Sequence, residues 1–160
     1  MDNHFSTEEA YTQRLRMLIG QRASLFYFMV DELEQAGIDW EPIARRAFFR
    51  YGCQRGSSSY SQTEDLQQFA REIVNPFSQK CFEMELTECS AEKAVIDFHH
   101  CPLLDAWQKT TDDPERLDLL CDVAMDGDRG VASLYPCFEF TLEQRIAAGD
   151  PVCRLVYTKK

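Results

Sequence analysis

Hydrophobic residues in the first half of the chain recur every three or four positions, which is the spacing of an amphipathic helix. The pattern predicts one long helix from the capping box at Ser6 to Gly37, and a second helix that ends at Gly52. A serine-rich stretch at 56–59 is predicted to be a loop, and a third helix follows it. Residues 1–76 are therefore expected to form a helical part.

From about residue 80 the pattern changes to an alternation of apolar and polar residues, which is typical of half-buried strands. Two strands separated by a short link predict a hairpin, and two more strands close the chain. Between the pairs, a short helix is expected to begin at Pro102, and a second helix from Pro114 should be stopped by Gly127 and Gly130. The four strands are expected at residues 82–87, 94–99, 134–142 and 152–157.

This order of elements predicts an α+β fold, because the strands come as hairpins and do not alternate with helices. We expect three N-terminal helices, then two antiparallel β-hairpins flanking a helical pair. The four strands should form a mainly antiparallel sheet that helices cover on one face. The 160 residues suit a single domain, with the helical part over 1–76 and an α+β part over 80–158.

The composition narrows the function classes. Hydrophobic residues make up 44% of the chain and charged residues 28%, which is ordinary for a globular protein. A formal net charge of −10 argues against a nucleic-acid or anionic-membrane partner, since both need clustered lysine and arginine. The chain opens with an acidic, polar stretch and contains no long apolar run, so a cytoplasmic location is expected. The oligomeric state is left open.

Seven cysteines are a high count for a chain of this length. The number is odd, the spacing is wide and no C-x-x-C pair occurs, so neither structural disulfides nor a zinc ribbon is predicted. Most of these thiols should be small apolar residues of the core. They stand at positions 53, 81, 89, 101, 121, 137 and 153.

The junction VIDFHHCPLLDAW places a cysteine where the second strand passes into a helix. At the strand period of two, Asp97, His99 and Cys101 share one face. Cys101 also stands at the helix N-terminus, where free N–H groups and the helix dipole should lower its pKa and make it a better nucleophile. The alternative is that Cys101 fills a buried helix start and His99 is a solvated strand residue. The pattern alone favours this structural interpretation.

Three short motifs stand out in the second half: Cys101-Pro102, Cys121 followed by Asp126, and the run GDPVCRLVY at 149–157. In order and spacing they resemble the L-2-amino-thiazoline-4-carboxylic acid hydrolase family. The implied fold is also similar to the 4-vinyl reductase and nitric-oxide or Golgi-transport group of ligand-binding domains. The resemblance implies a hydrolase with a small-molecule substrate, which opens a 2-aminothiazoline ring, a cyclic isothiourea, to give a carbamoyl-cysteine.

The resemblance also implies roles for individual residues. Carried over by position, Cys101 is the nucleophile and Asp126 is an acid/base or amidine-binding carboxylate. Cys121 and Cys153 become pocket residues or second thiols, with Asp150 shaping the turn beside them. We therefore expect Cys101, Cys121 and Asp126 to surround one pocket at the end of the second strand, with Cys153 close by.

Two alternatives stay open. Thiolates and a carboxylate that converge on one point could bind zinc, although the close pairs of a structural zinc site are missing; no other cofactor is expected. The residues concerned are Cys101, Cys121, Asp126 and Cys153. Alternatively, the domain binds a small molecule without converting it, as a sensor or carrier, because fold alone does not settle function. A substrate-binding part for His99 rests on strand geometry alone.

Overall fold

The computed structural model describes residues 7–160, so the predicted helix start at Ser6 lies outside the described residues. The chain forms helices and strands in the order α1 (Thr7–Gln35), α2 (Glu41–Ser59), α3 (Leu66–Ile73), α4 (Pro76–Cys81), β1 (Met84–Cys89), β2 (Lys93–Phe98), α5 (Pro102–Trp107), α6 (Pro114–Ala124), α7 (Asp126–Ala132), β3 (Phe138–Gln144), the 3-10 turn η1 (Ile146–Ala148) and β4 (Cys153–Lys159). No described helix is both long and apolar enough to cross a membrane.

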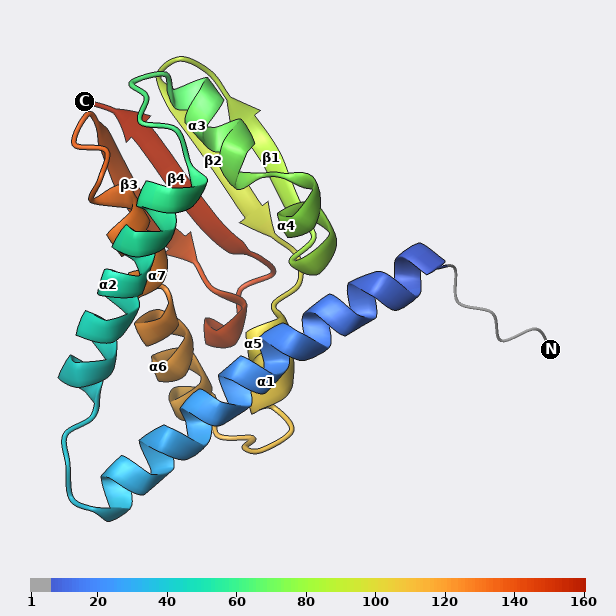
Figure 1. Cartoon of the computed structure of the whole chain (residues 1–160), viewed down its shortest axis with the longest axis vertical. Helices are drawn as coiled ribbons and strands as arrows, with labels where there is room; N and C mark the ends of the chain where they lie inside the picture. The colour runs from blue at the N-terminus through green and yellow to red at the C-terminus, as the bar shows by residue number, and fades with distance from the viewer. Residues whose placement is uncertain (1–6) are drawn as a thin grey trace.

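The four strands form one antiparallel sheet in the order β1-β2-β4-β3, which confirms the predicted fold class. Figure 1 shows the two hairpins side by side, with β2 and β4 in the centre of the sheet. Phe98 pairs with Cys153 and Ile96 with Leu155, so these four buried side chains share the face that the helices cover. The opposite face carries the polar positions.

The helices differ in number from the prediction. Four helices precede the sheet, because Asn75 does not simply end α3 but also begins α4: its side chain accepts a hydrogen bond from the Ser78 N–H at 3.0 Å, and Pro76 takes the first helical position. Likewise three helices, α5 to α7, lie between the hairpins instead of two. The short capped helices add turns that the hydrophobic period alone did not reveal.

The glycines expected to stop helices lie inside them. The helix α2 continues through Gly52 and the serine-rich stretch to Ser59, and α7 contains both Gly127 and Gly130. These two helices cross in backbone contact: a Cβ added to Gly52 would lie 1.9 Å from the Gly127 carbonyl oxygen, and one on Gly130 would lie 2.2 Å from the Phe49 oxygen. The glycines therefore serve close helix packing, and the helix ends predicted from them are wrong.

Candidate active site

A cavity of about 320 Å³ lies between the end of the sheet and the helices α2, α5, α6 and α7. Its opening is marked by the exposed side chains of Arg22 and Tyr51, while its wall is mostly apolar. The large apolar residues of the wall include Phe48, Phe82, Phe98, Leu103 and Trp107. Pockets of this kind, apolar with a few converging polar groups, are the usual form of small-molecule sites.

Three cysteines from three different elements meet at this cavity. Cys101 is the residue before α5, Cys121 lies on α6, and Cys153 is the first residue of β4. The strand β2 ends at Phe98, so the chain leaves the strand period and Cys101 turns toward the helix-covered side. The expected common face for Asp97 and Cys101 is therefore wrong, whereas the sequence argument correctly brought the three thiols together.

Cys153 has the surroundings of a thiolate. Its sulfur accepts a hydrogen bond from Cys121, and the backbone N–H of Ile146 donates a second one at 3.4 Å. The positive charge of Arg145 acts in the same direction, and together these contacts lower the pKa of Cys153 against the opposing effect of burial. The pKa of Cys121 is raised, because its proton is held in the hydrogen bond to Cys153 and because the thiol is buried.

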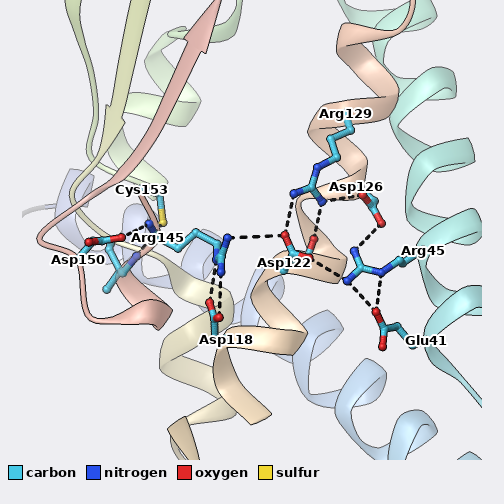
Figure 2. Close-up of polar contacts among 10 residues, drawn as sticks. Glu41, Arg45, Asp118, Asp122, Asp126, Arg129, Arg145, Asp150 and Cys153 are labelled. Carbon is cyan, nitrogen blue, oxygen red and sulfur yellow. Dashed lines mark hydrogen bonds and ion pairs between the residues drawn. The ribbon is translucent and has the colours of Figure 1, made fainter. Parts of the chain in front are cut away.

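Arg145 is held in place by carboxylates (Figure 2). Asp118 accepts two hydrogen bonds from its guanidinium, at 2.7 and 2.9 Å, and Asp122 lies 3.8 Å from it. The backbone N–H of Arg145 donates to Asp150 at 2.9 Å, which fixes the start of the turn η1. Asp150 thus shapes the turn that presents the Ile146 N–H to Cys153, and it lies outside the wall of the cavity.

We expect Arg145→Gln to raise the pKa of Cys153, because a positive charge that favours the thiolate is removed. The ultraviolet absorbance of the thiolate, followed against pH and compared with a Cys153→Ser reference, measures this pKa. Asp118→Asn should instead lower the pKa of Cys153, because the arginine stays and a negative charge that offsets it is removed. An unchanged titration in both variants would show that Arg145 does not act on this thiol.

Cys101 has the predicted contacts with N–H groups of α5, but its pKa is shifted in the opposite direction from the prediction. Burial raises its pKa to about 11, although the N–H groups of Leu104 and Leu103 favour the thiolate. The helix α5 has only six residues, and its N-terminus does not compensate for the loss of solvent around the sulfur. The predicted lowering of the pKa at Cys101 is therefore wrong, and this thiol is protonated at neutral pH.

The raised pKa predicts a loss of stability at alkaline pH. In the unfolded chain the Cys101 thiol ionises near its ordinary pKa of 9.0, whereas in the folded chain its pKa is about 11. The contribution of this thiol to the free energy of unfolding is therefore fully present below pH 9 and is lost as the pH rises from 9 to 11. Relative to Cys101→Ala, the wild type should lose about 1.4 kcal/mol of unfolding free energy by about pH 10. Urea unfolding under reducing conditions measures both chains. If the difference in unfolding free energy between the two chains stayed constant with pH, the raised pKa of Cys101 would be contradicted.

Asp126 lies away from the cavity. It is the first residue of α7, and its carboxylate accepts hydrogen bonds from Arg129 at 2.7 Å and from Arg45 at 3.1 Å. Both arginines also bind Asp122 (Figure 2). The expectation that Asp126 shares the pocket with Cys101 is wrong, and its carboxylate belongs to an ion-pair network that joins α2, α6 and α7.

The carboxylate that does line the cavity is Asp128. It pairs with Arg55 at 2.8 Å, and Arg55 lines the cavity as well. On a helix, residues two apart point in very different directions, so Asp126 and Asp128 cannot share one site. The sequence motif gave the right segment and the wrong aspartate, and no signal in the sequence singled out Arg55 or Arg22.

The described histidines do not reach the cavity. His99 is exposed and pairs with Glu85 at 3.0 Å, and His100 lies 3.2 Å from Asp105. A substrate-binding part for His99 has no geometric support at this cavity. Over the described part of the chain, no group of three or more histidine, cysteine or acidic side chains is arranged to hold a metal ion. All seven cysteines are unbridged.

Fold and site together define an α+β protein with a thiol-lined cavity at the end of an antiparallel sheet. The chain belongs to the L-2-amino-thiazoline-4-carboxylic acid hydrolase family, whose sequence model matches residues 17–157. This confirms the resemblance stated from the sequence motifs, and it supports hydrolase activity at the level of the family. No curated protein matches the chain.

The fold is similar to that of a trafficking protein particle complex subunit 3 from Naegleria fowleri, whose crystal structure contains covalently bound palmitic acid. The two chains share 12% sequence identity, and the similarity covers 90% of this chain and 96% of that one with a TM-score of 0.60. At this identity the likeness shows the fold alone. It agrees with the similarity to Golgi-transport ligand-binding domains that the sequence implied.

Proposed function

We propose that this protein hydrolyses a small cyclic isothiourea or amidine of the 2-aminothiazoline class in the thiol-lined cavity, with Cys153 as the nucleophile. The observation that carries the proposal is the convergence of Cys101, Cys121 and Cys153 on one cavity, where hydrogen bonds and positive charge together outweigh burial only at Cys153. Membership of the hydrolase family supports the reaction class. The family resemblance implies Cys101 as the nucleophile, but burial keeps that thiol protonated at neutral pH, and we therefore assign the role to Cys153.

Ring opening requires attack on the carbon between nitrogen and sulfur. The Cys153 thiolate adds to this carbon, the ring C–N bond breaks, and the departing nitrogen takes up a proton. Water then adds at the same carbon, gives up a proton and displaces the Cys153 thiolate. One water is consumed in total, the product is a carbamoyl-cysteine, and the thiolate is regenerated.

The charged residues of the cavity suit such a substrate. A 2-aminothiazoline carboxylate carries a cationic isothiourea and an anionic carboxylate. Asp128, oriented by Arg55 at 2.8 Å, is placed to attract the cation. Arg22, whose guanidinium donates to the Tyr51 hydroxyl at 3.4 Å, is the exposed cation at the opening. Cys121 would hold the thiolate through its hydrogen bond, and Cys101 would serve as a neutral part of the wall.

The test is turnover of 2-aminothiazoline-4-carboxylate by purified protein, followed by mass spectrometry of the product. We expect the substrate to gain the mass of one water, and an acid-quenched reaction to leave a covalent adduct on the peptide that contains Cys153. A panel of ring-substituted thiazolines and cyclic amidines extends the test to related substrates. Failure of the whole panel to react would reject the hydrolase proposal.

A second candidate function is favoured by the apolar wall of the cavity. A wall with Phe48, Phe82, Phe98 and Trp107 suits an acyl chain as well as a ring, and the similar trafficking subunit holds palmitic acid covalently. On this alternative the protein is a carrier in which a cavity thiol is acylated. Incubation with palmitoyl-coenzyme A and intact-mass measurement separates the two: a stable palmitoyl adduct without turnover of any thiazoline supports the carrier.

A further inference from the structure

The cavity contains an ion pair whose arginine has unused hydrogen-bond donors. Arg55 on α2 donates from Nη2 to Asp128 on α7 at 2.8 Å, and both residues line the cavity. Within the described part of the chain, its buried Nε–H has no hydrogen-bond partner, and Nη1 donates to no acceptor either. The Arg55 side chain is 34% exposed, so part of it stays accessible in the cavity wall. The protein alone therefore does not satisfy this cation.

Unused donors on a guanidinium favour an anionic ligand. The group stays charged at neutral pH, and its planar fork can bind a carboxylate through two parallel N–H bonds. Leaving such donors without a partner costs free energy, which is why native structures satisfy most of them. The second arginine of the wall differs, because Arg22 is exposed at the opening and already donates to the Tyr51 hydroxyl at 3.4 Å. Arg55 is therefore the better receptor for an anionic group inside the cavity.

Close packing of α2 on α7 fixes the position of this ion pair. Gly52 lies about one turn before Arg55 and contacts the residue before Asp128: a Cβ added to Gly52 would lie 1.9 Å from the Gly127 carbonyl oxygen. The pair also lies near the proposed nucleophile. The hydrogen bond that Cys153 receives from the neighbouring thiol lowers its pKa, and the negative charge of Asp128 acts against this shift. A ligand held by the pair is thus held beside the sulfur.

We propose that Arg55 is the residue that selects substrates with a carboxylate, acting together with Asp128. Arg55 binds the substrate carboxylate, and Asp128 binds the cationic ring N–H beside it, so that the four charges alternate in sign around the contact. This arrangement requires the carboxylate on the ring carbon next to nitrogen, as in 2-aminothiazoline-4-carboxylate. In the 5-carboxylate isomer the carboxylate lies beside sulfur. The inference rests on the proposed ring-opening function and adds the residue that recognises the substrate.

Substrate preference in matched arginine variants tests the proposal. The kcat/KM for 2-aminothiazoline-4-carboxylate is compared with that for 2-aminothiazoline, which lacks the carboxylate. We expect Arg55→Gln to lower the first value at least about thirtyfold and to leave the second within a few-fold, because only the carboxylated substrate loses charge-assisted hydrogen bonds. The control is Arg50→Gln, which removes the same charge from an exposed position of α2 that does not line the cavity. It should leave both values unchanged.

Equilibrium binding separates this inference from the proposed reaction. Cys153→Ser lacks the nucleophile, so titration calorimetry on this variant measures the dissociation constants of the same two compounds and of the 5-carboxylate isomer without turnover. Adding Arg55→Gln should raise the dissociation constant of the 4-carboxylate at least about thirtyfold. Arg55→Lys keeps the charge and loses the planar fork, so it should raise this constant by less.

Each outcome decides between the two claims. If no compound is turned over but Arg55→Gln removes the preference for the carboxylate in binding, the reaction is rejected and the role of Arg55 stands. If Arg55→Gln weakens both compounds equally, the ion pair is structural and the inference is overturned. Failure of Cys153→Ser to bind either compound overturns it as well. Equal binding of the two carboxylate isomers would remove Asp128 from the arrangement.

Circular dichroism checks that each variant is folded. If Arg55→Gln does not fold, Arg55→Lys replaces it in both measurements, because the lysine can keep an ion pair with Asp128. It should then weaken the 4-carboxylate and leave 2-aminothiazoline within a few-fold. A lysine variant that treats both compounds as the wild type does would contradict recognition of the carboxylate by the guanidinium of Arg55.

Discussion

Cys153→Ser is expected to lower kcat for ring opening by at least about a thousandfold, because a serine hydroxyl is not ionised at neutral pH and the proposed step needs an anionic nucleophile. Serine is only slightly smaller than cysteine, so the variant should keep the fold. Residue 153 is the buried first residue of β4 and lies opposite Phe98. Steady-state kinetics and the loss of the acid-stable adduct measure the effect together. Cys101→Ser is the internal control and should retain kcat within a few-fold, since Cys101 is protonated at neutral pH.

Cys121 offers a matched pair that separates the thiol from its hydrogen bond. Cys121→Ser keeps a donor to Cys153, whereas Cys121→Ala removes it, so only the alanine variant should move the acidic limb of the rate profile to higher pH. If Cys101→Ser abolished turnover while Cys153→Ser did not, the nucleophile would be the one that the sequence first indicated. The proposed position of the thiolate would then be rejected, and the reaction class would stand.

The fold class followed from the sequence because hairpins leave a clear pattern. Alternating apolar positions in residues 82–87 and 94–99 match the strands β1 and β2 within a few residues, because successive side chains of a strand point to opposite faces. The side chains of β1 alternate in exposure, whereas nearly every position of the central strand β2 is buried. Short capped helices such as α4 were harder to predict, because one or two turns are too short to show a hydrophobic repeat. Its only signal was Asn75 before Pro76, which equally describes a helix end.

The sequence predicted which cysteines meet at the candidate site, but it did not predict which of them ionises or which aspartate lines the cavity. The family motifs brought Cys101, Cys121 and Cys153 to one cavity, but which of them ionises depends on contacts from other elements: the N–H of η1 and the guanidinium of Arg145. A sequence shows a helix N-terminus and does not show how deeply it is buried. For the same reason the motif could not tell a carboxylate in an ion-pair network from Asp128 on the cavity wall.

Glycine was the most misleading residue type in this sequence. A glycine inside a helical pattern is usually taken to predict the end of the helix. Here Gly52 and Gly130 lie inside helices and permit the close contact between α2 and α7. That contact supports the site, because the same crossing positions Gly127 and Asp128 on the cavity wall. Adding one methyl group at these positions distinguishes a glycine that ends a helix from a glycine that permits close helix packing.

Gly52→Ala and Gly130→Ala are each expected to lower the free energy of unfolding by at least about 3 kcal/mol. The added Cβ would meet backbone atoms at 1.9 and 2.2 Å, so no side chain can rotate away and the helices must separate. If these glycines only ended helices, alanine would instead stabilise the chain by up to about 1 kcal/mol. Urea unfolding measures the change.

Gly20→Ala is the matched control for this prediction. Gly20 also lies inside a helix, but an added Cβ would be 3.4 Å from the Ala106 Cβ, which is an ordinary contact. The control should therefore be neutral or stabilising through helix propensity. Should all three variants unfold alike, close packing of α2 on α7 would not be the reason for the glycines. If the crossing variants stay folded at low temperature, they should also lose activity, because separation of the helices moves Asp128 away from Cys153.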